Sequence, residues 1–206
     1  MSQLDELEGV RRLRSGVLLL ILIPVLILIV ALVGAAAIYA TLMSAPVSSY
    51  TGSSLVADET VLAVVLALIS LVLIVMAFRR LSGGFSLLSA AGRGGSIGVA
   101  GTWLVIIAII IALLGAALFM FGGFIAMWIA FVLVAVGFIL IGVGLYEVGS
   151  SYGKDLLRAG GILVAIPLLI TSFIGLILSY VALGDIMREL QAKASQAGAQ
   201  PATTTS

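Results

Sequence analysis

Apolar residues along the chain fall into five long blocks, which are separated by polar or glycine-rich stretches. Each block has about the ~20 residues that a helix needs to cross ~30 Å of hydrocarbon. None shows the apolar–polar alternation of a half-buried strand, and a helix pairs its backbone amides within its own segment, as lipid requires. The pattern predicts an all-α, polytopic membrane helix bundle of about five transmembrane helices. We expect these helices at about 16–43, 59–78, 102–121, 124–148 and 162–186.

Polar segments flank this predicted transmembrane domain of residues 16–186. Residues 1–15 place leucines and arginines at helical spacing, which is typical of a short amphipathic helix on the cytoplasmic membrane surface; the alternative is a solvated start of the first helix. Residues 187–206 become polar and end in Pro-Ala-Thr-Thr-Thr-Ser. Such a tail cannot bury enough apolar surface to fold, so we expect it to be disordered.

Glycines and prolines interrupt the simple pattern. Residues 79–101 hold seven glycines among apolar residues, which favours a re-entrant or interfacial segment over a spanning helix. Pro24 and Pro167 lie inside the first and fifth predicted helices. Each is a candidate kink, because proline lacks the N–H that the helix ladder needs. At Pro167 the alternative is a re-entrant loop in place of a fifth span.

Glycines inside the later helices are candidates for close packing. Lipid supplies no hydrophobic drive for helix association, so small residues that let two backbones approach are used instead. The glycine faces fit packing within the chain and, alternatively, a homo-oligomer or a membrane-protein partner. The candidates are Gly115, Gly137, Gly142, Gly144 and Gly175.

Composition limits the chemistry. Of the 206 residues, 63% are hydrophobic and 9% are charged, whereas a soluble domain has about 25% charged residues. The chain has no cysteine and no histidine, which excludes thiolate nucleophiles and histidine-ligated metals. Serines and threonines in the predicted helices have no neighbouring group in sequence that could activate them. We therefore expect no enzyme activity, no catalytic residue, no metal and no cofactor.

The ten Lys and Arg residues predict the orientation. Eight of them precede the first helix or lie between the second and third or the fourth and fifth helices; Arg188 and Lys193 are the exceptions. The positive-inside rule then favours a cytoplasmic N-terminus in the cell membrane. Five spans would place the C-terminal tail on the outer side. The net charge of +1 creates no field that would attract nucleic acid.

Basic residues on the predicted cytoplasmic side are candidate contacts for anionic lipid heads. Basic clusters beside transmembrane helices attract such lipids, but the simpler explanation, which we favour at this point, is that the charges only fix the topology. No ionisable residue lies in a predicted helix interior, so coupling to protons or sodium is not expected. The candidates are Arg79, Arg80, Arg93, Lys154 and Arg158.

Several glycine and aliphatic stretches are distinctive. They are Leu-Glu-Gly-Val-Arg-Arg-Leu-Arg-Ser-Gly at 7–16, Arg-Arg-Leu-Ser-Gly-Gly-Phe-Ser-Leu-Leu at 79–88, Ile-Gly-Val-Gly-Leu-Tyr-Glu-Val-Gly at 141–149, Tyr152 with 157–163, and Ile-Gly-Leu-Ile-Leu-Ser-Tyr at 174–180. In these stretches the chain resembles an uncharacterised archaeal multi-pass membrane family, known as domain of unknown function 973. The resemblance implies a membrane helix fold and an archaeal setting, but no activity and no site residues.

Two classes of function remain open. The glycine faces and the lack of intramembrane charge favour a non-enzymatic accessory, scaffolding or assembly subunit, whose partners are the lipid bilayer and another membrane protein. The alternative is a channel or transporter for a neutral or lipophilic solute, which would need kinked helices around a cavity.

Overall fold

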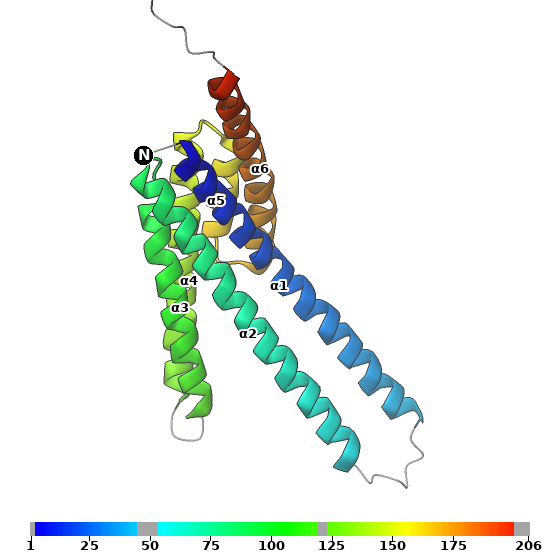
Figure 1. Ribbon diagram of the computed structural model, residues 1–206. Coiled ribbons are helices and arrows are strands. Elements are labelled where there is room, and N and C mark those ends of the chain that lie inside the picture. The colour runs from blue at the N-terminus through cyan, green and yellow to red at the C-terminus, as the bar shows by residue number, and fades with distance from the viewer. Residues whose placement is uncertain (1–2, 45–52, 119–122, 200–206) are drawn as a thin grey trace, which may run out of the picture.

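A computed structural model describes residues 3–44, 53–118 and 123–199 of the chain (Figure 1). All regular secondary structure in these ranges is helical, so the predicted membrane helix bundle is confirmed. Four described stretches, in α2, α3, α4 and α6, are long and apolar enough to cross a bilayer, and the expected number of about five spans is approximate. The helices are α1 (Gln3–Ser44), α2 (Ser53–Ala90), α3 (Ser96–Ala117), α4 (Phe124–Ser151), α5 (Asp155–Ala165) and α6 (Leu169–Ala199).

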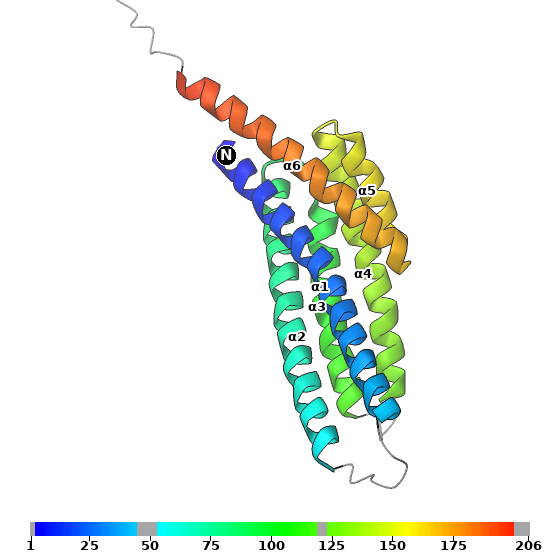
Figure 2. The ribbon, with the colours of Figure 1, turned by 90° about the vertical axis from the view of Figure 1, so that its right-hand side faces the viewer.

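The helices run alternately between two ends of the molecule (Figures 1 and 2). At one end, which we call the charged end, α1 begins and α2, α4 and α6 finish; α1 and α3 finish at the other. Toward that other end the α1–α2 pair slants away from the α3–α4 pair (Figure 1). The core consequently gathers near the charged end, where Leu13, Phe85, Ile141 and Leu183 are fully buried.

The segment 79–101 is not re-entrant or interfacial, and that expectation is wrong. α2 continues as a helix to Ala90, because its glycines pack instead of breaking the helix. A Cβ on Gly84 would lie 2.7 Å from the backbone nitrogen of Leu13, so the missing side chain lets α1 and α2 touch. The turn into α3 uses three glycines with positive φ, a conformation that favours this residue: Gly92, Gly94 and Gly95.

Both polar flanks are helical where the structure describes them. The predicted surface segment 1–15 is continuous with the rest of α1 from Gln3 onward. Val10 and Leu13 of this segment are buried in the bundle, whereas Leu4 is exposed. The tail expected to be disordered from residue 187 is helical to Ala199. Its alanines, glutamines and lysine favour helix, and the buried Leu190 anchors it.

The fifth predicted helix, 162–186, is two helices, so the expectation of one continuous span is wrong. α5 ends at Ala165 and α6 begins at Leu169, because Pro167 between them cannot donate to the helix ladder. Pro167 lines a pocket together with Phe138, which lies about halfway along α4. α5 and α6 therefore form a hairpin that begins at the charged end, turns beside the middle of α4 and returns to the charged end.

The hairpin reverses the expected position of the C-terminal segment. α6 finishes at the same end at which α1 begins (Figure 2), so the expectation that it would leave on the opposite side is wrong up to Ala199. Arg188 and Lys193, the two exceptions to the charge rule, thereby join the other eight basic residues. The ten Lys and Arg residues lie in the first parts of α1 and α5, the last parts of α2 and α6, and the α2–α3 and α4–α5 turns, which are the segments toward the charged end (Figure 1).

Candidate functional site: a helix break and an apolar cavity

Arg93 ties the α2–α3 turn to two other segments. Its Nε donates to Glu6 Oε1 at 3.2 Å, and its guanidinium lies 5.1 Å from the ring centroid of Tyr152. The Tyr152 hydroxyl donates to Glu6 Oε2 at 3.3 Å. Burial first, and then the charge of Glu6, raise the pKa of Tyr152 to about 12. This candidate lipid contact is therefore engaged in a network that joins α1 to the turns after α2 and α4.

Lys154 and Arg158 also have acidic partners. The Lys154 ammonium donates to Glu189 and so connects the α4–α5 turn to α6. Arg158 Nη1 donates to Asp155 Oδ1 at 2.9 Å, one turn away in α5. Such largely exposed pairs each contribute roughly 0–1 kcal/mol. Three of the five candidate lipid contacts are thus paired within the chain.

Arg79 and Arg80 differ from the other three, because within the described residues they have no ion pair or hydrogen bond. They line a groove of about 470 Å³ together with Arg11 and Arg12 of α1. Sequence reasoning missed these last two residues. The signal was present, since antiparallel first and second helices bring the basic start of one beside the basic end of the other.

Arg14 is a third basic residue whose role sequence reasoning missed. Its guanidinium carbon lies 4.5 Å from the ring centroid of Tyr180, and its Nε is buried with no hydrogen-bond partner in the described part of the chain. Gly184 leaves room for it, because a Cβ there would lie 3.4 Å from the guanidinium carbon. The cation–π contact joins α1 to α6.

Each of the five predicted packing glycines faces a neighbouring helix or turn of the same chain. A Cβ on Gly142 would lie 2.5 Å from the backbone nitrogen of Ala165, and one on Gly175 would lie 2.7 Å from the carbonyl oxygen of Gly160. Gly144 meets α3 at Gly98 in the same way. The same holds for Gly115 and Gly137, which face α4 and α3. The structure therefore uses these residues for packing within the chain.

Side-chain hydroxyls satisfy the backbone at the break between α5 and α6. The Ser172 hydroxyl donates to the carbonyl oxygen of Ile166 at 2.9 Å, and the Thr171 hydroxyl donates to that of Leu168, also at 2.9 Å. An unpaired carbonyl in hydrocarbon costs several kcal/mol. Both carbonyls also accept a backbone N–H, from Leu168 and Ser172 respectively. The two hydroxyls, which showed no activating neighbour in the sequence, therefore add a second hydrogen bond to each carbonyl at the break.

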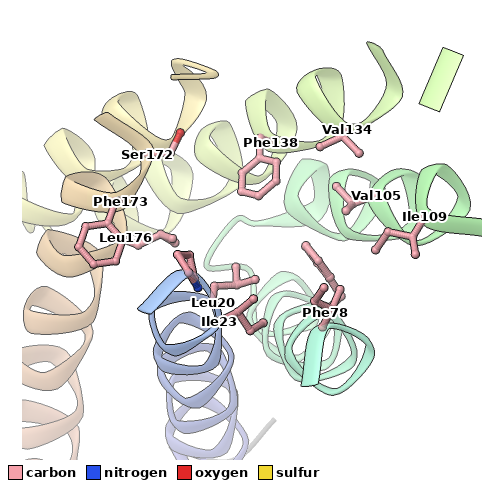
Figure 3. Close-up of a pocket in the computed structure, with 12 residues that line it drawn as sticks. Leu20, Ile23, Phe78, Val105, Ile109, Val134, Phe138, Ser172, Phe173 and Leu176 are labelled. Atoms are coloured by element: carbon pink, nitrogen blue, oxygen red, sulfur yellow. The ribbon is translucent and has the colours of Figure 1, made fainter. Parts of the chain in front are cut away.

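An apolar cavity of about 250 Å³ lies beside this break (Figure 3). Side chains from α1, α2, α3, α4 and α6 point into it, among them Ile23, Phe78, Ile109, Phe138 and Leu176. Ser172 supplies the one polar side chain in the wall, and its hydroxyl proton is already committed to the break. The cavity therefore offers apolar contact and almost no hydrogen bonding.

A second cavity, of about 260 Å³, adjoins the first. It lies between α4 and the turn of the α5–α6 hairpin and shares Val134, Phe138 and Ser172 with the first cavity. Its remaining wall includes the exposed Phe131 and Leu168. The two cavities therefore share part of their walls at the helix break.

A family model described as "Protein of unknown function (DUF973)" matches residues 6–206. The chain belongs to the DUF973 family. No curated protein and no solved structure matches it. The resemblance seen in the sequence is thereby confirmed over nearly the whole chain.

In this DUF973 protein the sequence indicated two elements of the cavity without locating it. Pro24 lines the cavity from inside the continuous helix α1, and Pro167 lies in the wall of the adjoining one. The aliphatic and aromatic lining residues gave no separate signal, because they look like every other apolar residue of a membrane helix.

Proposed function

We propose that this DUF973 protein is a non-enzymatic membrane protein that binds an alkyl chain, or a similar lipophilic solute, in the cavity beside its helix break. The observation that carries the proposal is the wall of that cavity, which is built from hydrocarbon side chains of five helices. This is the lipophilic-solute class of function. Transport follows from binding if the α5–α6 hairpin moves.

The chemistry of the wall selects the ligand. An apolar cavity of roughly 150 Å³ excludes water and takes up a small aromatic molecule. The cavity here has about 250 Å³, so it accommodates a larger apolar group, and an empty space of this kind is unfavourable because the lining atoms lose their contacts. A charged or strongly hydrated solute would find no partner in it.

The helix break supports a gating role for the hairpin. Phe138 and Ser172 stand between the two cavities, and Ser172 also holds the carbonyl of Ile166. A shift of the hairpin would therefore change the shared wall of the two cavities and the hydrogen bond to the Ile166 carbonyl together. Broken helices that line cavities are a common feature of transporters.

The orientation is part of the proposal. The ten Lys and Arg residues lie in the helix parts and turns toward the charged end, and the positive-inside rule assigns that end to the cytoplasm. Both the start of α1 and the end of α6 would then face the cytoplasm. The cell membrane is the bilayer we expect the protein to occupy.

The subunit class of function is the second candidate, and a partner face is the observation it needs. The five glycines that suggested such a face pack within the chain. An aromatic cluster on α4 remains, because Phe124, Trp128 and Phe131 form edge-to-face pairs on an exposed surface. This cluster would be the contact site if a partner copurifies.

Photolabelling tests the proposal. The purified protein in lipid nanodiscs is exposed to a fatty acid that carries a diazirine on its alkyl chain, and labelled peptides are identified by mass spectrometry. Ile109→Trp fills the cavity, whereas Ile107→Trp adds the same side chain at an exposed position of α3. We expect labelling of the cavity wall in the wild type and in Ile107→Trp, and its loss in Ile109→Trp.

Two outcomes would overturn the proposal. Equal labelling of the cavity wall in both variants would place the probe on the outer surface. Absence of labelling in the wild type, together with a stoichiometric protein that copurifies from native membranes, would favour the subunit class. Thermal unfolding of each variant shows that it is folded before labelling is compared.

A further inference from the structure

A basic groove lies on the outer face of the α1–α2 pair, turned away from the apolar cavity. It has about 470 Å³. On α1 and α2 its residues point away from the buried positions Leu13, Leu81 and Phe85. The groove is lined by Glu8, Arg11, Arg12, Ser15, Arg79 and Arg80.

The fold holds Arg12 in this groove. Its Nε donates to Glu8 Oε1 at 2.8 Å. A Cβ on Gly83 would lie 3.5 Å from Arg12 Nη1, so the glycine lets the guanidinium lie across the surface of α2. The groove is therefore a product of the α1–α2 contact, and neither helix alone would form it.

The charges in the groove are not balanced by the chain. Four guanidinium groups share one carboxylate, and Arg11, Arg79 and Arg80 have no acidic partner among the described residues. Like charges that converge beside an apolar bundle repel one another more strongly than in water. An anion in the groove would relieve this repulsion, and the planar fork of arginine suits a phosphate group in particular.

The surface below the groove distinguishes a lipid phosphate from a soluble one. On α1, Leu18 and Leu22 follow Arg11 and Ser15 at spacings of three and four residues, so they lie on the same face. On α2, Val72 and Met76 precede Arg79 and Arg80 on the corresponding face. All four apolar residues are exposed. The groove thus continues into an apolar strip that runs toward the other end of the molecule.

We propose that this surface is a binding site for an anionic membrane lipid, whose phosphate lies in the groove and whose alkyl chains lie along the apolar strip. The site is distinct from the cavity of the proposed function. It gives the unpaired arginines a role beyond topology, namely selection of the lipids that surround the α1–α2 pair.

A thermal-shift titration tests this site in the detergent-solubilised full-length protein. The ligands are phosphatidylglycerol, phosphatidylcholine and inorganic phosphate. The variant Arg79→Gln/Arg80→Gln removes two charges from the groove, and Arg188→Gln/Lys193→Gln removes two charges from the same half outside it. We expect phosphatidylglycerol to raise the Tm of the wild type and of the control. Its apparent affinity for the groove variant should fall roughly tenfold or more, because charge-assisted hydrogen bonds are lost.

The titrations with inorganic phosphate and phosphatidylcholine, and a lysine variant, decide whether the groove recognises a lipid phosphate. Inorganic phosphate that reproduces the shift would assign the groove to a soluble anion and overturn the lipid assignment. An equal loss of affinity in both variants would mean attraction by overall charge, and an equal response to phosphatidylcholine would mean that the phosphate is not recognised; either result overturns the site. Arg79→Lys/Arg80→Lys keeps both charges, and a partial recovery of affinity is expected from it.

Discussion

The α3–α4 and α5–α6 hairpins turn at different depths. α3 has 22 residues and α4 has 28, and both run the length of the bundle. α5 has 11 residues and turns beside Phe138, about halfway along α4. Both hairpins close through glycine contacts, Gly101 with Gly137 in one and Gly160 with Gly175 in the other.

The hairpins differ at the turn and also in polarity, because α3 and α4 carry one charged residue, Glu147, whereas α5 and α6 carry six. The α5–α6 hairpin reverses at Pro167. There the hydroxyls of Thr171 and Ser172 donate hydrogen bonds to the carbonyl oxygens of Leu168 and Ile166. A proline without such neighbours can be passed by a continuous helix, as Pro24 is in α1. Pro167 therefore separates α5 from α6 within a hairpin, and α6 finishes at the end of the molecule at which α5 begins.

The largest predicted effect is in thiol labelling, which reports the side of the membrane on which α6 ends. Single cysteines at Ser53, Ser151 and Ala192 can be labelled with a membrane-impermeant thiol reagent, since the chain has no natural cysteine. We expect Ala192→Cys to behave like Ser151→Cys and opposite to Ser53→Cys, because α5–α6 returns to the charged end. With a cytoplasmic N-terminus, only Ser53→Cys reacts in intact cells. Joint labelling of Ser53→Cys and Ala192→Cys would instead mean that α5 and α6 cross the bilayer as one span.

The second largest effect is the loss of stability expected when a large side chain is placed between the two hairpins. Gly142→Leu would force a side chain against the backbone of α5, where even a Cβ would lie 2.5 Å from Ala165 N. We expect a loss of about 3 kcal/mol in unfolding free energy, the upper end of the range for overpacking, seen as a lower Tm in detergent. Val136→Leu, at an exposed position of α4, is the control. An unchanged Tm for both variants would show that α4 and α5 are not in contact.

Removal of the hydroxyls at the turn should have a moderate effect. Thr171→Val combined with Ser172→Ala leaves the carbonyls of Ile166 and Leu168 without these donors, and we expect a loss of about 1–2 kcal/mol. Thr102→Val is the control, because the Thr102 hydroxyl donates to the carbonyl oxygen of Val99 within the uninterrupted helix α3. Unfolding in detergent measures both. A greater loss for the control would contradict a special role of hydroxyls at the break.

The smallest loss of stability is expected at Tyr152, in the turn that joins α4 to α5. The pKa of Tyr152 is raised to about 12 from an ordinary value of 10, so its stabilising contribution is complete below pH 10 and is lost as the pH rises toward 12. Tyr152→Phe should cost less than about 1 kcal/mol at pH 7, since it loses one hydrogen bond. It should also lose less stability than the wild type between pH 10 and 12. Parallel curves of Tm against pH would rule out this coupling.

Prediction from the sequence was successful where one segment decides the outcome. The apolar runs predicted the helical class, because that class depends on the solvent in which each segment lies. It failed at residues 79–101, where seven glycines suggested an irregular segment. A glycine that breaks a helix and one that faces another helix have the same local sequence, and only the neighbour distinguishes Gly84 from Gly92.

The sequence by itself determined that this chain is a helical membrane protein with its basic residues concentrated between particular helices. Those properties follow from transfer of side chains and backbone amides into lipid, which each segment undergoes largely on its own. Only the tertiary structure decided that Pro167 marks a reversal, that a cavity lies beside it, and that Arg11 and Arg12 share a groove with Arg79 and Arg80. These features depend on contacts between segments far apart in the chain, and hydrophobicity alone does not distinguish one apolar partner from another.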